Sequence, residues 1–165
     1  MPEPAIADEP ETTRITVVTS VTATSTLAAK SPNAYAPARV LELADIEHDL
    51  PPSSAWCEGK PDEGIGEGVT LAFAAPTKIK EVVLRAGFWK TEKLFRANNI
   101  VTGVELRTDD GRKKSVALPA KLEVVTVALG GAAVRELTVS IARVKKGKMN
   151  DSCLSNVEVH TDPES

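Results

Sequence analysis

The sequence predicts an all-β protein, a sandwich or barrel of about eight strands. Valine and threonine dominate short alternating segments, and both residue types favour strands. Turn signals separate these segments at short intervals. No segment has the pattern of a long helix, so no crossover helices are available to connect parallel strands. We therefore expect mostly antiparallel pairing, with fewer than about a tenth of the residues in helices.

Length and charge restrict the class of protein further. The 165 residues are most simply one domain with a real core. The net charge of -3 gives no overall electrostatic signature of nucleic-acid binding. No apolar stretch has transmembrane length, and the acidic start of the chain lacks the features of a signal peptide. We expect either a cytoplasmic protein or a module of a larger exported one.

The first third of the chain contains one strand and one short helical segment. Residues 1–12 are rich in proline and acidic residues and are expected to form a flexible tail before a domain over 13–161, with a second tail at 162–165. Residues 14–26 alternate between apolar and hydroxyl side chains, with a change of phase near Val18 that indicates a bulge. Residues 39–45 have room for one or two helical turns.

The remaining strands are more regular. Asp109-Asp110-Gly111 is a hairpin signal, and Gly130-Gly131 marks another turn. The segment 145–148 is a basic turn. These signals separate seven expected strands, at residues 69–73, 79–85, 100–108, 113–118, 122–129, 134–144 and 156–160.

An acidic, glycine-rich loop at residues 56–67 lies between the first third of the chain and the seven regular strands that follow it. Its glycines lack the spacing of a dinucleotide-binding fingerprint, and no Gly-Lys-Ser/Thr ending marks a phosphate loop. The loop is therefore a structural corner or part of a binding rim. Trp56 at its head is expected in the core, and stacking on a sugar is the alternative.

A second loop, at residues 87–99, holds most of the aromatic residues and has no clean period. Phe88 and Trp89 are neighbours, so in extended backbone they point in opposite directions. Trp89 is either an exposed platform for the C–H face of a sugar or a hydrophobic plug over the end of the sheet. The polar side chains beside it either bind ligand hydroxyls or stabilise their own turn. They are Lys90, Lys93, Arg96, Asn98 and Asn99.

The chain has two cysteines, Cys57 and Cys153. A pair cannot make a four-cysteine zinc site, and His48 and His160 have no ligand spacing. The cysteines are either buried thiols or a disulfide. A disulfide would close a loop of roughly a hundred residues and add about 2–4 kcal/mol of stability, and it would place the domain outside the cell or at its surface.

Several short motifs together resemble a known family. The segment from Val21 to Trp56 resembles the opening of discoidin-like domains, the coagulation-factor C-type fold. The rest is similar to a bacterial group of these domains, the NADase-type glycan-binding domain. The motifs that carry this resemblance, in order, are residues 56–59, 64–67, 86–90, 98–99, 110–111 and 151–158.

The resemblance implies an eight-stranded, galactose-binding-like jelly-roll sandwich with a rim of loops at one end. It also implies that the two ends of the domain lie close together, which favours contact between Cys57 and Cys153. Related carbohydrate modules hold a structural calcium ion, and the equivalent positions are Asp49, Ser54 and Glu158. Leucine and proline replace the glycine and the second polar residue of that loop, so it is short of the six to eight oxygens that calcium needs, and we expect no cofactor.

The function expected is non-catalytic binding of a glycan or glycoconjugate through the 87–99 loop, with Glu58, Glu67 and Asp151 beside it as an acidic pocket. The alternative is that the same acidic residues bond loop amides and lysines. A protein-interaction module on the same rim is the alternative, with a protein partner or a larger parent chain. Glu58 and Glu67 would suit a glycosidase only at a suitable separation, and no histidine lies in a nucleophile motif, so an enzyme is not expected.

Overall fold

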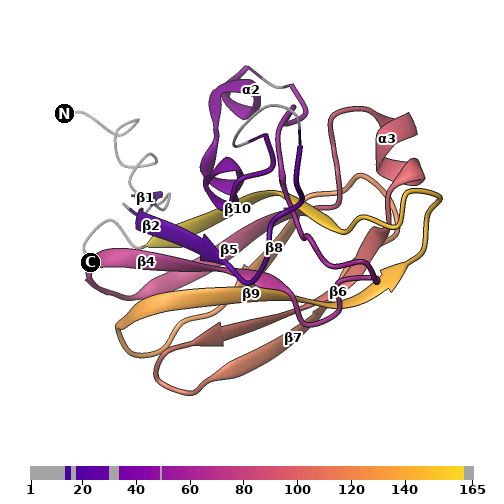
Figure 1. Cartoon of the computed structure of the whole chain (residues 1–165). Helices are drawn as coiled ribbons and strands as arrows, with labels where there is room; N and C mark the ends of the chain where they lie inside the picture. Colours follow the sequence, from indigo (N-terminus) through magenta and orange to yellow (C-terminus); the bar gives the residue numbers. More distant parts are fainter. Residues whose placement is uncertain (1–13, 16–17, 30–33, 49, 162–165) are drawn as a thin grey trace.

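The computed structural model describes residues 14–15, 18–29, 34–48 and 50–161, and these form a β-sandwich of two five-stranded sheets (Figure 1). The first sheet has the order β1-β10-β5-β8, with β3 also paired to β10. The second has the order β2-β4-β9-β6-β7. Every ladder between these strands is antiparallel. The predicted sandwich is confirmed, since about half of the described residues lie in strands and about a tenth lie in helices.

The strand bounds show ten strands among the described residues, of which β1 and β3 have two residues each. Those of the first sheet are β1 Arg14–Ile15, β3 Trp56–Cys57, β5 Ile79–Ala86, β8 Val125–Ala128 and β10 Cys153–Thr161. Those of the second sheet are β2 Val18–Ala23, β4 Gly68–Thr77, β6 Ile100–Thr108, β7 Lys113–Ala117 and β9 Val134–Lys145.

Alternating side chains build the core between the sheets. Leu71 in β4 and Leu137 in β9 are opposite one another and fully buried. Val82 and Leu84 of β5 face them from the other sheet within one apolar cluster. On the outer face, the hydroxyls of Thr70 and Thr138 share a hydrogen bond of 2.8 Å. The period of two therefore decides which side chains are buried.

Local details differ from the expected bounds. The register shifts between Val18 and Ser20, where a bulge was expected. Strand β4 continues through Pro76, which was expected in a turn. Strand β8 is half the length expected for residues 122–129. The described residues include no helix long and apolar enough to cross a membrane.

Within the described ranges, three short helices lie outside the sheets. A 3-10 helix η2 (Pro37–Leu41) and α2 (Ala44–Glu47) occupy the expected helical segment, and α3 (Glu92–Ala97) lies within the 87–99 loop. Thr91 caps α3, because its hydroxyl accepts a 3.0 Å hydrogen bond from the amide of Leu94. Figure 1 shows α2 and α3 at the top of the view, beyond the first sheet. The expected tails, 1–12 and 162–165, lie outside the described residues.

Candidate functional site

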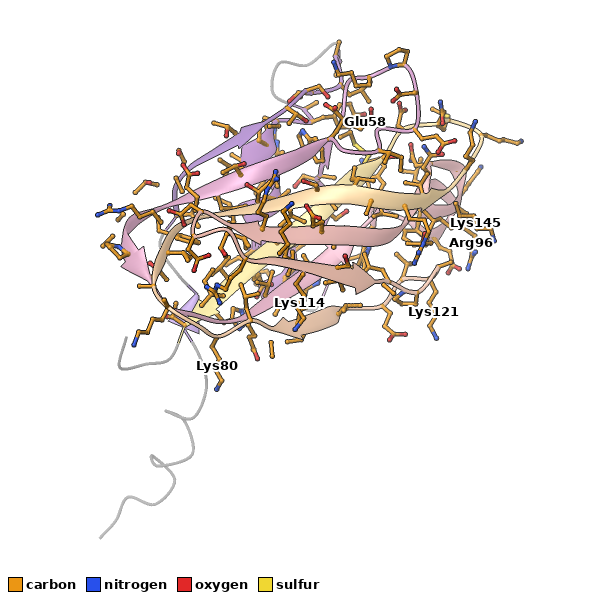
Figure 2. All side chains as sticks on the ribbon, turned by 90° about the horizontal axis from the view of Figure 1, so that it is seen from below. Glu58, Lys80, Arg96, Lys114, Lys121 and Lys145 are labelled. Carbon is orange, nitrogen blue, oxygen red and sulfur yellow. A yellow bond between two sulfur atoms is a disulfide. The ribbon has the colours of Figure 1, made fainter. Side chains whose placement is uncertain are left out.

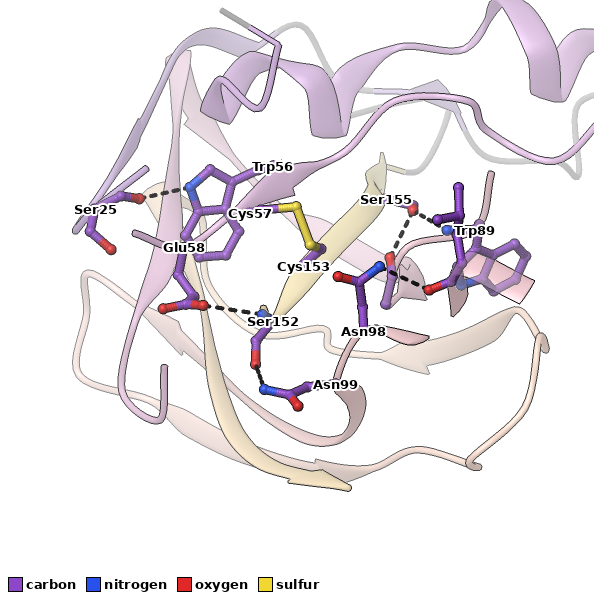
Figure 3. Close-up of a disulfide and its surroundings, with 12 residues drawn as sticks. Ser25, Trp56, Cys57, Glu58, Trp89, Asn98, Asn99, Ser152, Cys153 and Ser155 are labelled. Atoms are coloured by element: carbon purple, nitrogen blue, oxygen red, sulfur yellow. Dashed lines mark hydrogen bonds between the residues drawn. A yellow bond between two sulfur atoms is a disulfide. The ribbon is translucent and has the colours of Figure 1, made fainter. Parts of the chain in front are cut away.

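A disulfide corner joins the 56–67 loop to the last strand (Figure 3). Cys57 in β3 lies opposite Cys153 in β10, and the two form a disulfide with an S–S distance of 2.08 Å. Trp56 beside it is fully buried, and its indole N–H donates to the carbonyl of Ser25 at 2.9 Å. The expected core position of Trp56 is therefore confirmed.

Glu58 is the most deeply buried carboxylate of this corner, with no exposed surface. One of its oxygens accepts the amide N–H of Ser152 at 3.1 Å, and the other accepts that of Lys60 at 3.0 Å. Burial raises the pKa of Glu58, while these two hydrogen bonds act in the opposite direction. A Cβ on Gly64, whose φ is 77°, would lie 2.5 Å from the Glu58 side chain, so the loop needs glycine there.

The other acidic candidates do not bind the same groups as Glu58. Glu67 accepts the hydroxyls of Thr24 and Ser25, each at 2.7 Å, and these bonds lower the pKa of Glu67. Asp151 is half-buried, and burial raises the pKa of its carboxyl. Glu58 therefore bonds loop amides, which was the alternative to a ligand-binding acidic pocket.

Trp89 is buried, with 7% of its surface exposed. It packs in a small cluster with Phe95 and Ile100. Its backbone N–H donates to the Ser155 hydroxyl at 2.9 Å, and its indole N–H donates to the Ala86 carbonyl at 2.7 Å. The expectation of an exposed Trp89 platform is wrong. The indole is buried, as the alternative of a hydrophobic plug over the end of the sheet predicts.

Asn98 and Asn99 are also buried and serve their own loops. The Asn98 amide donates to the Leu94 carbonyl at 2.8 Å, at the end of α3. The Asn99 amide donates to the Ser152 hydroxyl at 3.1 Å, and its oxygen accepts the N–H of Gly147 at 2.8 Å. These contacts correct the expectation that the two asparagines bind ligand hydroxyls.

The basic candidates remain at the surface. Lys90, Lys93 and Arg96 are all exposed. Arg96 pairs with Glu92 one helical turn away, at 3.1 Å. Of these three cations, Lys90 lines a surface hollow between the 87–99 loop and the η2 segment.

This surface hollow, the Tyr35–Phe88 hollow, has a volume of about 390 Å³. The Tyr35 and Phe88 rings meet edge to face, with centroids 6.4 Å apart. Among the described residues, the Tyr35 hydroxyl and the Lys90 ammonium have no hydrogen-bond partner. The full lining is Ala34, Tyr35, Arg39, Glu42, Ser53, Ser54, Ala55, Phe88 and Lys90.

Glu42 organises the polar side of the hollow. Its carboxylate accepts the Arg39 guanidinium and the Ser54 hydroxyl, each at 2.7 Å. The sequence did not predict the polar side of the hollow, because residues 39–45 indicated only one or two helical turns and no binding role. The one available signal was Tyr35, the single tyrosine, in a turn-rich loop.

The calcium candidates do not fit a metal ion. Glu158 is bound at one oxygen by the Arg85 guanidinium, at 2.7 Å, and at the other by His160, at 2.9 Å. Ser54 donates to Glu42, and Asp49 lies outside the described residues. Within the described ranges, no three His, Cys, Asp or Glu side chains gather as a metal site. A cation already occupies the neighbourhood of Glu158, so calcium would compete with Arg85.

Residues 12–160 match the family model described as the NAD glycohydrolase translocation F5/8 type C domain. The chain belongs to this family. The match confirms the resemblance to discoidin-like domains, since F5/8 type C is the coagulation-factor C-type fold. No curated protein matches this chain.

Solved structures share its jelly-roll fold. One is the family 32 carbohydrate-binding module of Clostridium perfringens NanJ in complex with galactose, with 12% identity, a TM-score of 0.56 and coverage of 86% of this chain and 92% of that one. The CBM32-5 module of CpGH89 from the same organism, in complex with GalNAc-β-1,3-galactose, has 13% identity, a TM-score of 0.62 and coverage of 85% and 93%.

A third similar structure holds the CBM32-1 and CBM32-2 domains of C. perfringens ZmpB in complex with GalNAc. It has 12% identity and a TM-score of 0.62, and the match covers 87% of this chain. This chain spans only 33% of that longer chain. At such low identities, the likeness of all three structures establishes the fold.

Proposed function

We propose that the domain is a non-catalytic carbohydrate-binding module whose ligand occupies the Tyr35–Phe88 hollow. The observation that carries this proposal is the combination of two aromatic rings in one concave site with the ammonium group of Lys90, which has no partner among the described residues. Its volume of about 390 Å³ lies within the usual range of small-molecule sites. The carbohydrate ligands of the three similar modules support the same class of ligand.

The chemistry of the lining suits a sugar. An aromatic side chain offers an apolar surface to the C–H face of a pyranose. Around it, the hydroxyls of Ser53 and Ser54 and the ion pair of Arg39 with Glu42 supply both donors and acceptors for sugar hydroxyls. Lys90 adds a charged donor, which makes stronger hydrogen bonds than a neutral group.

The state of the carboxylates supports a non-catalytic role. Glycoside hydrolysis uses two carboxyl groups on either side of the scissile bond. Glu42, the one carboxylate among the described lining residues, is held by Arg39 and Ser54. Glu58 and Glu67 bind backbone amides and hydroxyls at the disulfide corner, so neither takes part in the hollow.

Titration of the domain with galactose and with GalNAc tests this proposal. Lys90→Ala should weaken binding by about 10- to 150-fold, because a hydrogen bond to a charged group is worth about 1.5–3 kcal/mol. Lys93→Ala is the matched control, since Lys93 is also exposed and lies outside the hollow, and it should bind as the wild type does. Equal affinity in the two variants would reject the hollow as the site.

A glycan-array screen separates the carbohydrate module from the protein-interaction module. The observation that favours the latter is the exposure of Ile65 and Met149, at 51% and 58%. Exposed apolar side chains are common in protein contacts. No binding to any glycan, together with recovery of a single protein partner, would support the interaction module on the same rim.

A further inference from the structure

The charges of the chain are unevenly distributed. Residues 68–150 contain 16 lysines and arginines and seven aspartates and glutamates, which is a net charge of +9. The rest of the chain has a net charge of -12. Residues 68–150 are therefore strongly basic, although the whole chain has a net charge of -3. A field of one sign over part of a surface attracts a partner of the opposite sign.

Basic side chains follow the edge of the sandwich where β7 and β8 are the last strands of their sheets. Figure 2 shows Lys80, Lys114, Lys121 and Lys145 following one another along the lower and right-hand side of the view, with Glu58 on the opposite side. The Lys114 ammonium reaches from β7 to the Ala128 carbonyl of β8, at 2.9 Å. We name this surface the basic edge; it comprises Lys80, Arg112, Lys113, Lys114, Lys121 and Lys145.

A second hollow, of about 340 Å³, lies within the basic edge. Arg112 is held in place there by Asp110 at 2.9 Å and by the carbonyl of Gly130 at 2.6 Å. Gly131 has a φ of 90°, which favours glycine, and a Cβ there would displace the Arg112 guanidinium from its present place. The described lining is Leu106, Thr108, Arg112, Lys113, Lys114 and Leu129.

Much of this positive charge is uncompensated. Among the described residues, Lys113, Lys114 and Lys145 have no acidic partner within ion-pair distance. The carbonyl that Lys114 contacts leaves its charge intact. An anion at this edge would therefore meet several ammonium groups that no carboxylate neutralises.

We propose that the basic edge binds an acidic polysaccharide, with sulfate or carboxylate groups spaced along the lysines. A linear polyanion fits a band of charge that extends along the strands, and the hollow at Arg112 and Lys113 accommodates one anionic group. Single-stranded nucleic acid fits less well, because it needs aromatic stacking and the last aromatic residue of the chain is Phe95. This edge is separate from the Tyr35–Phe88 hollow, so each can fail without the other.

Titration of the whole chain with heparin, a sulfated polysaccharide, tests this proposal, with neutral dextran as the control ligand. Heparin should bind and dextran should not, and affinity should fall as salt is added, since counterions compete. Lys113→Gln and Lys114→Gln should each weaken heparin binding by about 1.5- to 5-fold, as expected for exposed charge pairs. Lys60→Gln removes the same charge at a residue whose amide bonds Glu58, the side chain that Figure 2 shows opposite the basic edge, and it should have no effect.

Three outcomes would overturn the proposal. They are the absence of heparin binding at low salt, equal losses in Lys60→Gln and Lys113→Gln, and binding to vesicles containing phosphatidylserine without binding to heparin. The vesicle experiment is needed because Leu122 and Val124 are exposed in the β7–β8 connection, at 37% and 42%. Galactose binding should be unchanged in the Lys113 and Lys114 variants, which separates this test from that of the hollow.

Discussion

The disulfide corner and the Tyr35–Phe88 hollow are made of the same kinds of side chains, yet they differ in what those side chains contact. In the corner, Trp56, Glu58 and Asn99 bind protein groups with their polar atoms. In the hollow, Tyr35 and Lys90 present polar atoms without a partner among the described residues. A buried polar group that is fully bonded stabilises a fold, and an unbonded one in a concave site is available to a ligand.

Phe88 and Trp89 show the same difference within two adjacent residues. Trp89 is buried against Phe95, while Phe88 is half-buried and meets Tyr35. Neighbouring side chains in extended backbone point to opposite sides. Trp89, the larger aromatic residue, therefore packs in the core, whereas Phe88 lines the candidate site.

Trp89→Ala should have the largest effect of the changes considered at the corner and the hollow. Removing a buried tryptophan costs about 3–5 kcal/mol of unfolding free energy, because a cavity remains. Lys90→Ala is the control at the next position, and it should change stability by less than about 0.5 kcal/mol. Urea unfolding measures both, and a stable Trp89→Ala variant with impaired glycan binding would reverse the assigned roles.

Loss of the disulfide should come next. The bond closes a loop with a sequence separation of 96 residues. The double variant Cys57→Ala/Cys153→Ala should lose about 2–4 kcal/mol of stability, since its unfolded chain gains conformational freedom. Adding a reductant to the wild type should give a similar loss and leave the double variant unchanged. Two titratable thiols in denatured, unreduced protein from an oxidising compartment would contradict the bond.

The smallest effects are opposite pH dependences at Glu58 and Glu67. Burial raises the pKa of Glu58 in the folded state, so the stability difference between wild type and Glu58→Gln should fall as pH rises above the ordinary glutamate pKa of 4.5 toward the raised pKa. Hydrogen bonds from Thr24 and Ser25 lower the pKa of Glu67, so the corresponding difference for Glu67→Gln should grow as pH rises toward 4.5 from below. Slopes of the same sign would contradict the distinct environments of the two carboxylates.

Strand periodicity explains why the fold could be predicted from the sequence. Leu137, Val139 and Ile141 alternate with polar residues, and this pattern alone places them in the core. The pairing of Cys57 with Cys153 followed from the resemblance, since composition left both thiols and a disulfide open.

The candidate site was predicted less well, because it depends on contacts between distant segments. The 87–99 loop has no period, so its sequence did not determine whether Phe88 or Trp89 was buried. Asn99 is satisfied by Ser152 and by the Gly147 amide, which no local pattern reveals. Lys90 was the one candidate of that loop to reach the hollow, while the η2 residues that complete it were not considered.

The disulfide between Cys57 and Cys153 has a further consequence for limited proteolysis. Strands β4 to β9 all lie between the two cysteines in the sequence. A protease that cuts once in any loop of this stretch, including the one beside the basic edge, would leave two fragments covalently joined. Such a nicked molecule would migrate near its full mass on a denaturing gel until a reductant separates the pieces, and the paired strands of both fragments would remain tethered in one particle.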